Sequence, residues 1–211
     1  MKKLKGMTTQ QKIAYIRDYY TLHIIAAVVA VAAMGWALNH YVFNPPPRTF
    51  INISFYGQFV STNLREILAE DLTAALVDEG ANYIVFVDNF FAADDDPQFA
   101  MAMAQRMAAM MTAREIDIFI IGPGAAEGFI EAGFALDLHE VLTRAQLARL
   151  EDMGAVKTVE SAPLGLRPAY LPYFYGLAQQ FGGNFDGWTL IVMSNNDRCD
   201  AVQTFIDFIT E

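Results

Sequence analysis

The chain has 211 residues, which suffices for one domain of about 100–200 residues with an appendage and excludes a large multidomain enzyme. Hydrophobic residues make up 54% of it and charged residues only 18%, so disorder is excluded and a membrane segment is expected. Residues 1–43 hold five basic residues and one acidic residue, which leaves nine basic and 23 acidic residues beyond them, a formal charge of −14. Such an acidic body repels phosphate groups, so we expect no nucleic-acid partner.

Residues 22–43 have the composition of a membrane-spanning helix. Ile24–Leu38 contains no polar side chain, and a helix over the whole segment would extend roughly 33 Å, which is about the thickness of a bilayer core. Aromatic residues such as Tyr20 and Trp36 stand near its two ends, as in spans whose rings lie at the headgroups. Because basic residues precede the segment, the positive-inside rule places residues 1–21 in the cytoplasm. The sequence therefore predicts a signal anchor that holds a single-pass protein in the cell membrane, with its C-terminal domain extracytoplasmic.

A cleavable signal peptide is the alternative interpretation. Residues 35–37 (GWA) have the small-x-small pattern that a signal peptidase recognises after an apolar stretch. The preceding region is long and has a helical pattern of its own, with Thr8 or Thr9 as a possible N-cap, which favours the anchor. Cleavage would instead release a secreted module. The single cysteine, Cys199, excludes an internal disulfide and lies far from any position for a lipid anchor.

Beyond the span, a stiff proline-rich spacer at 44–48 precedes a domain over residues 49–211. Strand-like and helix-like patterns alternate in the order β-α-β-α-β, which predicts parallel strands joined by right-handed crossovers. We therefore expect a three-layer α/β fold with a mostly parallel sheet. The expected strands lie at 49–56, 83–87 and 115–121, and the expected helices lie at 62–77, with Gly80 ending the helix, and at 97–114.

The second half of the chain is harder to assign. Residues 169–177 (AYLPYFYGL) are rich in aromatic side chains, among them Tyr173 and Tyr175. These residues either line a ligand cleft or belong to a strand that packs across the domain. The other expected elements are a loop and short helix at 122–134, a helix near 144–150, strands at 156–159 and 188–193, and a helix at 201–209.

Two runs of like residues have a metal-binding and a structural interpretation. Asp94-Asp95-Asp96 can hold a divalent cation, or Asp96 caps a helix that begins at Pro97. The methionines of 101–111 can ligate copper, or they form a helix face that packs on a sheet, since several are spaced by three or four residues. The structural interpretation is favoured in both cases, and we expect no metal site and no cofactor.

The glycine-rich segment Gly122–Gly128 follows a strand and opens a helix, which is the context of a dinucleotide-binding loop. Its spacing, G-x-G-x-x-x-G, is one residue longer than the fingerprint, so nucleotide binding is not expected. The loop is still a candidate ligand site, because open α/β sheets bind ligands at the carboxyl ends of their strands. The alternative is a plain turn.

Catalytic signatures are missing from the sequence. It has no His-Glu-x-x-His, no Gly-x-Ser-x-Gly, no paired-cysteine motif and no Gly-Lys-Ser/Thr phosphate loop. His139, beside Glu140, is the one histidine beyond the span, and a lone histidine at a polar helix start is usually solvated. Spacing alone selects no catalytic carboxylate pair among so many acids. We therefore expect no enzymatic activity and no catalytic residue.

Three stretches of the chain carry a resemblance. They are REIDIFIIGPGAAEGFIEAGFALDLHEVL (Arg114–Leu142), WTLIVMSNNDRCDAVQTFIDFITE (Trp188–Glu211) and the opening strand–helix–strand, Thr49–Val87. The first is similar to a strand, short helix and L-D-L turn of the extracellular solute-binding proteins, which have the type 2 periplasmic-binding fold. The second is similar to that family's late strand and closing helix, and the third fits its first lobe.

The resemblance implies a solute-binding lobe. Members of the family normally have two lobes, whereas only residues 143–166 are available here for a second one, so we expect the clamp to be reduced or lost. No ligand residue of the family transfers, because ligand residues vary with the solute. By position, the carboxyl edge of the expected sheet presents Tyr56, Gly57, Asp88, Gly122, Pro123 and Gly124.

These observations predict a non-enzymatic, membrane-anchored protein that acts as an interaction or sensing subunit at the membrane. In the sensing case, the edge loops contact a small solute. In the interaction case, which the missing half-clamp favours, the domain docks on a membrane-protein partner. If the N-terminal segment is cleaved, the alternative is a secreted module that binds a small solute.

Overall fold

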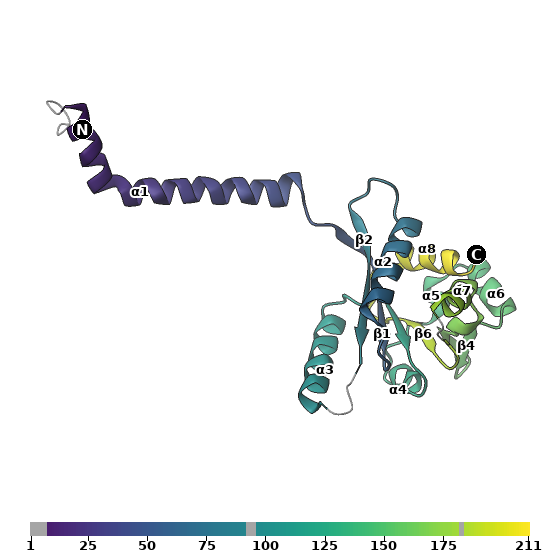
Figure 1. The fold of residues 1–211 in the computed structure, drawn as a ribbon. Helices are drawn as coiled ribbons and strands as arrows, with labels where there is room; N and C mark the ends of the chain where they lie inside the picture. Colours follow the sequence, from purple (N-terminus) through teal and green to yellow (C-terminus); the bar gives the residue numbers. More distant parts are fainter. Residues whose placement is uncertain (1–7, 92–95, 182–183) are drawn as a thin grey trace. The chain divides into compact units, whose positions relative to one another are not determined.

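The computed structural model describes residues 8–91, 96–181 and 184–211, with only the backbone described at 11–19 and at 181 (Figure 1). The chain divides into two compact units, Met1–Pro47 and Arg48–Glu211. We describe each unit by itself.

The N-terminal unit consists of a long helix. Helix α1 (Thr9–Leu38) continues into one π-helical segment, η2 (Asn39–Phe43), and the stretch Tyr20–Phe43 has a mean hydropathy of 2.0 with none of its apolar window buried. Near its end, the rings of Trp36 and His40 stack 5.3 Å apart. This helix is long and apolar enough to cross a membrane, and a signal sequence has the same two properties.

The second unit is built on one six-stranded sheet whose order is β2-β1-β3-β6-β5-β4. The pairs β1–β2 and β1–β3 are parallel, as the β-α-β-α-β order predicts, but β3–β6, β5–β6 and β4–β5 are antiparallel. The fold is therefore α/β with a mixed sheet, and the expectation of a mostly parallel sheet was wrong. The strands are β1 (Arg48–Tyr56), β2 (Tyr83–Phe90), β3 (Ile118–Ile121), β4 (Val156–Val159), β5 (Ala162–Leu166) and β6 (Thr189–Val192).

The two crossover helices begin at capped positions. Ser61 accepts a hydrogen bond from the Leu64 amide at the start of α2 (Thr62–Leu76), and Asp96 caps α3 (Pro97–Thr112) with Pro97 in its first turn. Helix α2 ends at Leu76, where Val77 becomes extended, so Gly80 does not end it as expected. Gly80 instead has a φ of +88° in the turn that leads to β2.

Residues 143–166 were the only segment available for a second lobe, and they belong to the same domain, where their two strands join the sheet. Residues 143–166 form α6 (Arg144–Asp152), which starts with a capping box between Thr143 and Gln146, and then the hairpin β4–β5. The aromatic segment is helical, so the strand interpretation was wrong. Pro168, just before it, starts the 3₁₀ helix η3 (Pro168–Tyr170), and Pro172 starts helix α7 (Pro172–Phe181). The remaining helices are α4 (Ala126–Glu131), α5 (Leu138–Val141) and α8 (Cys199–Ile209).

Apolar cores lie on both faces of the sheet. On one face, side chains of α2, α6, α7 and α8 pack on β1, β2, β3 and β6, with Leu68, Leu150, Phe174 and Phe205 among the buried residues. On the other face, α3 and α4 cover a smaller cluster around Phe119. The helices of one layer thus bury one face of each central strand, as the continuous apolar runs of β3 and β6 require.

Candidate functional site

Four buried polar side chains interrupt the apolar surface that the sheet presents to α3. They belong to three neighbouring chain segments, and the strand register pairs Ser54 of β1 with Asp88 of β2. A buried polar group is informative because burial of such a group is costly unless it is hydrogen-bonded or paired. The four residues are Asn52, Ser54, Asp88 and Asp117, each no more than 3% exposed.

Asp117 directly precedes β3 and is fully buried. One carboxylate oxygen accepts hydrogen bonds from the Asn52 amide (2.8 Å) and from the Arg198 guanidinium (2.6 Å), and the other accepts one from the Asn196 side chain (2.8 Å). Burial raises the pKa of Asp117 above its ordinary value of 3.8, although the Asn52 amide and Arg198 oppose the rise. Asp117 thus fixes the loop before α8 to the start of β3.

Asp88, which the sequence placed at the ligand edge, lies inside β2 and is committed to neighbouring side chains. It forms ion pairs with Arg65 of α2, at 3.7 Å, and with Arg106 of α3. It also accepts a hydrogen bond from the amide of Asn89, while the amide of Val85 donates to a side-chain oxygen of α2. Strand β2 lies at the edge of the sheet, and the amides of Val85 and Asn89 are both hydrogen-bonded to side chains. The two ion pairs of Asp88 connect α2 on one face of the sheet with α3 on the other. The structure therefore explains the burial of Asp88 without a ligand.

A hollow of about 580 Å³ lies beside this polar row, and we call it the α3 hollow. Its walls include Asn52, Phe86, Arg106, Met110 and Arg198. Arg198 is paired with Asp117, and Arg106 shares Asp88 with Arg65. Glu115 adds a further carboxylate to the wall, so the charges around the hollow largely cancel. The site can therefore hold a ligand by hydrogen bonds from guanidinium groups and by apolar contact, but it offers no strong excess of positive charge.

The predicted carboxyl edge is in large part closed by its own backbone. The amide of Gly122 donates to the Tyr56 carbonyl at 2.8 Å, and a β-carbon on Gly122 would lie 3.2 Å from that same oxygen. A β-carbon on Gly187 would meet the ring of Pro123 at 3.2 Å. The Tyr56 ring packs edge to face on Phe129, at 5.0 Å. Glycine at 122 is therefore explained by close packing of two strand ends.

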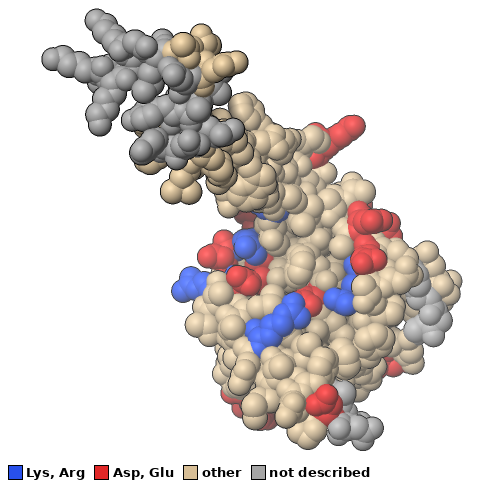
Figure 2. Space-filling model, turned by 60° about the vertical axis from the view of Figure 1, so that its left-hand side comes forward, with Lys and Arg blue, Asp and Glu red and all other residues tan. Residues whose placement is uncertain are grey.

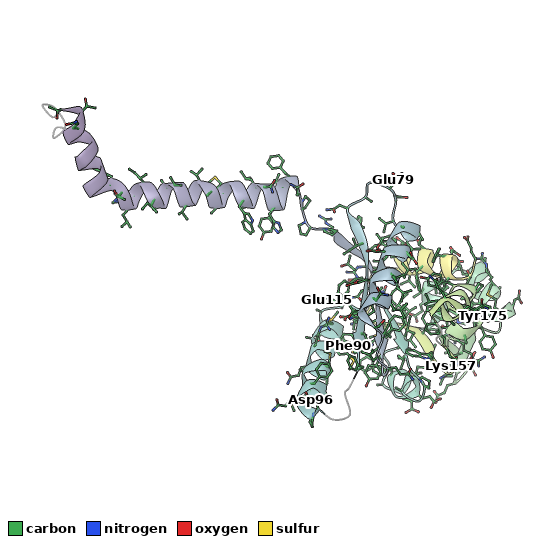
Figure 3. All side chains as sticks on the ribbon, in the orientation of Figure 1. Glu79, Phe90, Asp96, Glu115, Lys157 and Tyr175 are labelled. Atoms are coloured by element: carbon green, nitrogen blue, oxygen red, sulfur yellow. The ribbon has the colours of Figure 1, made fainter. Side chains whose placement is uncertain are left out.

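Three other predicted site residues are separate from this edge. Gly124 has a φ of +85°, and a β-carbon there would meet nothing within 4 Å, so it serves the turn into α4. Tyr173 is partly buried and packs on Phe208 against the core, whereas Tyr175, labelled in Figure 3, is 62% exposed. Two residues apart on one helix, these tyrosines have different surroundings. The structure thus brings Tyr56, Gly57, Gly122 and Pro123 together and leaves four other predicted residues apart from them: Asp88, Gly124, Tyr173 and Tyr175.

The runs that had a metal-binding interpretation mostly have structural roles. Asp96 accepts hydrogen bonds from Gln98 and Phe99 as the N-cap of α3, as favoured, while Asp94 and Asp95 lie outside the described residues. Met103, Met107, Met110 and Met111 pack against the smaller core. Within the described residues, no three or more His, Cys, Asp or Glu side chains are grouped so that they could hold a metal ion. His139 is largely exposed and contacts Asp137 at 2.9 Å.

Helix α3 presents an exposed surface with almost no charge. None of its residues is buried, Met101 is 65% exposed, and Arg106 is its one charged residue. Asp96 and Glu115 stand at its two ends (Figure 3). On the face drawn in Figure 2, most charged side chains lie in a band across the middle of the domain, and the lower part carries few. We call the set Met101, Ala102, Gln105, Ala108 and Ala109, all exposed, the α3 surface.

The residues that spacing could not identify are Asn52, Asp117 and Arg198. Asp117 and Arg198 lie 81 positions apart in the sequence, and their pairing depends on the antiparallel entry of β6. One signal was present, since an acid interrupts the apolar run IDIFII before β3. A charged residue inside a buried strand pattern indicates a paired or functional group.

No protein-family model matches this chain, and no curated protein matches it.

Proposed function

We propose that this chain is a single-pass membrane protein without catalytic activity, whose domain lies outside the cytoplasm and docks on a partner in the same membrane. The apolar helix Tyr20–Phe43 and the basic residues before it support the anchor and its orientation. The α/β domain, related to one solute-binding lobe in the resemblance, would be the docking module. The observation that carries the proposal is the α3 surface.

The chemistry of the α3 surface defines the partner. The domain has a formal charge of −14, yet this helix exposes methionine, alanine and glutamine, with Asp96 at its start and the neighbouring Arg114 and Glu115 after its end. An exposed apolar surface on an otherwise charged domain marks an interaction site. Met101 can adapt to an apolar surface, and the alanines permit close approach. The partner therefore presents an apolar surface with a basic residue that would face Asp96, whereas Glu115 adjoins the exposed Arg114, so the charges at that end of the helix offset each other.

The test is recovery of the full-length chain from detergent-solubilised membranes with its partner. Wild type should bring down a membrane protein in a fixed ratio, and the intact mass of the recovered chain should show that the N-terminal helix is retained. Gln105→Glu places a charge on the α3 surface and should lower recovery at least fivefold. Gln179→Glu makes the same change at an exposed position of α7 and should leave recovery unchanged. Equal recovery with both variants would refute docking through α3.

A secreted module that binds a small solute is the second candidate. The α3 hollow favours it, because about 580 Å³ is the size of a small-molecule site and its wall combines apolar side chains with guanidinium groups. In that case the recovered chain would begin near Leu38 and would carry no partner. Intact mass therefore separates the two candidates in the same experiment.

A further inference from the structure

A second hollow, of about 620 Å³, lies where β1 begins, between the end of α2 and the start of α8. We call it the α8 hollow. Its apolar wall includes Phe50, Leu76 and Tyr83, and the rings of Phe50 and Tyr83 meet edge to face at 6.4 Å. Its volume is within the range of pockets that hold small molecules, about 300–1,000 Å³. None of its wall residues is among those that the sequence singled out as a candidate site.

The charges around the α8 hollow are mostly negative. Asp78, Asp197 and Asp200 line it, and none of them forms an ion pair within the part of the chain that the structure describes. Arg198 is the one basic residue in the wall, and its charge is balanced by buried Asp117 at 2.6 Å. The hollow therefore retains an excess of carboxylates.

Helix dipoles do not reverse this sign. The carboxyl end of α2, at Leu76, is partly negative, and the amino end of α8, at Cys199, is partly positive. Both ends contribute to the wall, so their partial charges largely offset each other. The sign of the local potential is then set by the three carboxylates.

We propose that the α8 hollow binds a small organic cation with an apolar body, such as an arylalkyl amine. The ammonium group lies among Asp78, Asp197 and Asp200, and the apolar body lies against Phe50 and Tyr83. An aromatic face also attracts a cation directly, which adds to the selection for positive charge. This site is distinct from the α3 surface, so the proposal does not depend on docking through that helix.

The test compares two probes of similar shape and opposite charge, phenethylamine and 3-phenylpropionate. Their binding to the full-length chain in nanodiscs is measured by titration calorimetry, with empty nanodiscs as the blank. The amine should bind at least tenfold more tightly than the acid, and its affinity should fall as salt is raised. Equal binding of both probes, or no binding of the amine above the blank, would overturn the proposal.

Variants locate the bound cation. Asp78→Asn and Asp197→Asn should each weaken amine binding by roughly three- to tenfold, because each removes one nearby negative charge. Asp152→Asn, an exposed site at the end of α6, should leave it unchanged. Both wall aspartates are exposed, so neither substitution should unfold the domain, and the melting temperature of each variant checks this. Gln105→Glu should also leave amine binding intact. Partner recovery therefore tests docking through α3, and amine titration tests the α8 hollow, independently of each other. Unchanged affinity in both wall variants would refute the assignment.

Discussion

Asp117→Asn is the substitution that most directly tests the buried polar row. The carboxylate accepts three hydrogen bonds, from Asn52, Arg198 and Asn196. A side-chain amide has one acceptor oxygen, so its NH₂ group must face at least one of these donors. The lost charge-assisted bond and the unsatisfied buried donor should together cost about 2–4 kcal/mol of unfolding free energy. Arg198 is a third exposed and regains contact with water, which favours the lower half of this range.

For a domain of this size, each 1 kcal/mol shifts the melting temperature by about 2–4 °C, so the loss should be about 4–16 °C. Thermal unfolding of the full-length chain in detergent can be followed through the fluorescence of Trp188, which is buried in the core of the domain. Asp152→Asn changes an exposed acid in the same way and should alter stability by less than about 0.5 kcal/mol. If Asp117→Asn were as stable as this control, the hydrogen bonds to the carboxylate would contribute nothing and our reasoning would be refuted.

The same variant has a pH dependence with a defined sign. Because burial raises the pKa of Asp117 above 3.8, the folded chain binds this proton more tightly than the unfolded chain. As pH falls from the raised pKa of the folded chain to the pKa of the unfolded chain, near 3.8, protonation of Asp117 therefore adds to the free energy of unfolding. This added stability is lost again as pH rises through the raised pKa. Asparagine does not titrate. The stability difference between wild type and Asp117→Asn should thus widen on acidification, and a difference that narrows would contradict burial as the dominant cause.

Four further substitutions test other features by thermal unfolding. Tyr173→Phe removes a buried hydroxyl that has no hydrogen-bond partner among the described residues, so stability should rise by up to about 1 kcal/mol at neutral pH. Burial, with a contribution from a nearby acid, raises the pKa of Tyr173 to about 12, so wild type should also lose stability relative to Tyr173→Phe between pH 10 and 12. Gly165→Ala should cost about 1–3 kcal/mol, because its β-carbon would lie 2.9 Å from a Thr189 methyl, whereas Gly176→Ala in α7 meets nothing within 4 Å and should gain about 0.5–1 kcal/mol. Asp96→Ala should cost about 1 kcal/mol through the lost cap of α3, and no change would contradict the capping role.

Local patterns predicted the first half of the domain because each signal there is short-range. Apolar runs located β1, β2 and β3, and Asp96-Pro97 marked the start of α3. The crossover rule then gave the parallel pairs, since β-α-β units allow few alternatives.

The second half could not be predicted in the same way. Periodicity identifies a strand such as β6 but gives no direction, and its antiparallel pairing with β3 follows only from the path of the whole chain. Residues 169–177 were not predicted to be helical, although Pro168 and Pro172 start helices at the first position, where the missing N–H is not needed. The role of Asp88 depends on β2 being an edge strand, and sheet order is not visible in a local pattern.

The side-chain contacts along the outer edge of β2 limit how a partner can bind there. An uncovered edge strand would offer its backbone groups to a strand from another chain. Here the amides of Val85 and Asn89 already donate to side chains, and Asp88 is held by Arg65 and Arg106 from the two flanking helices. Strand addition at this edge would have to break those contacts. A partner that approaches this side of the sheet is therefore expected to meet side chains of the neighbouring helix, and this agrees with docking on the α3 surface.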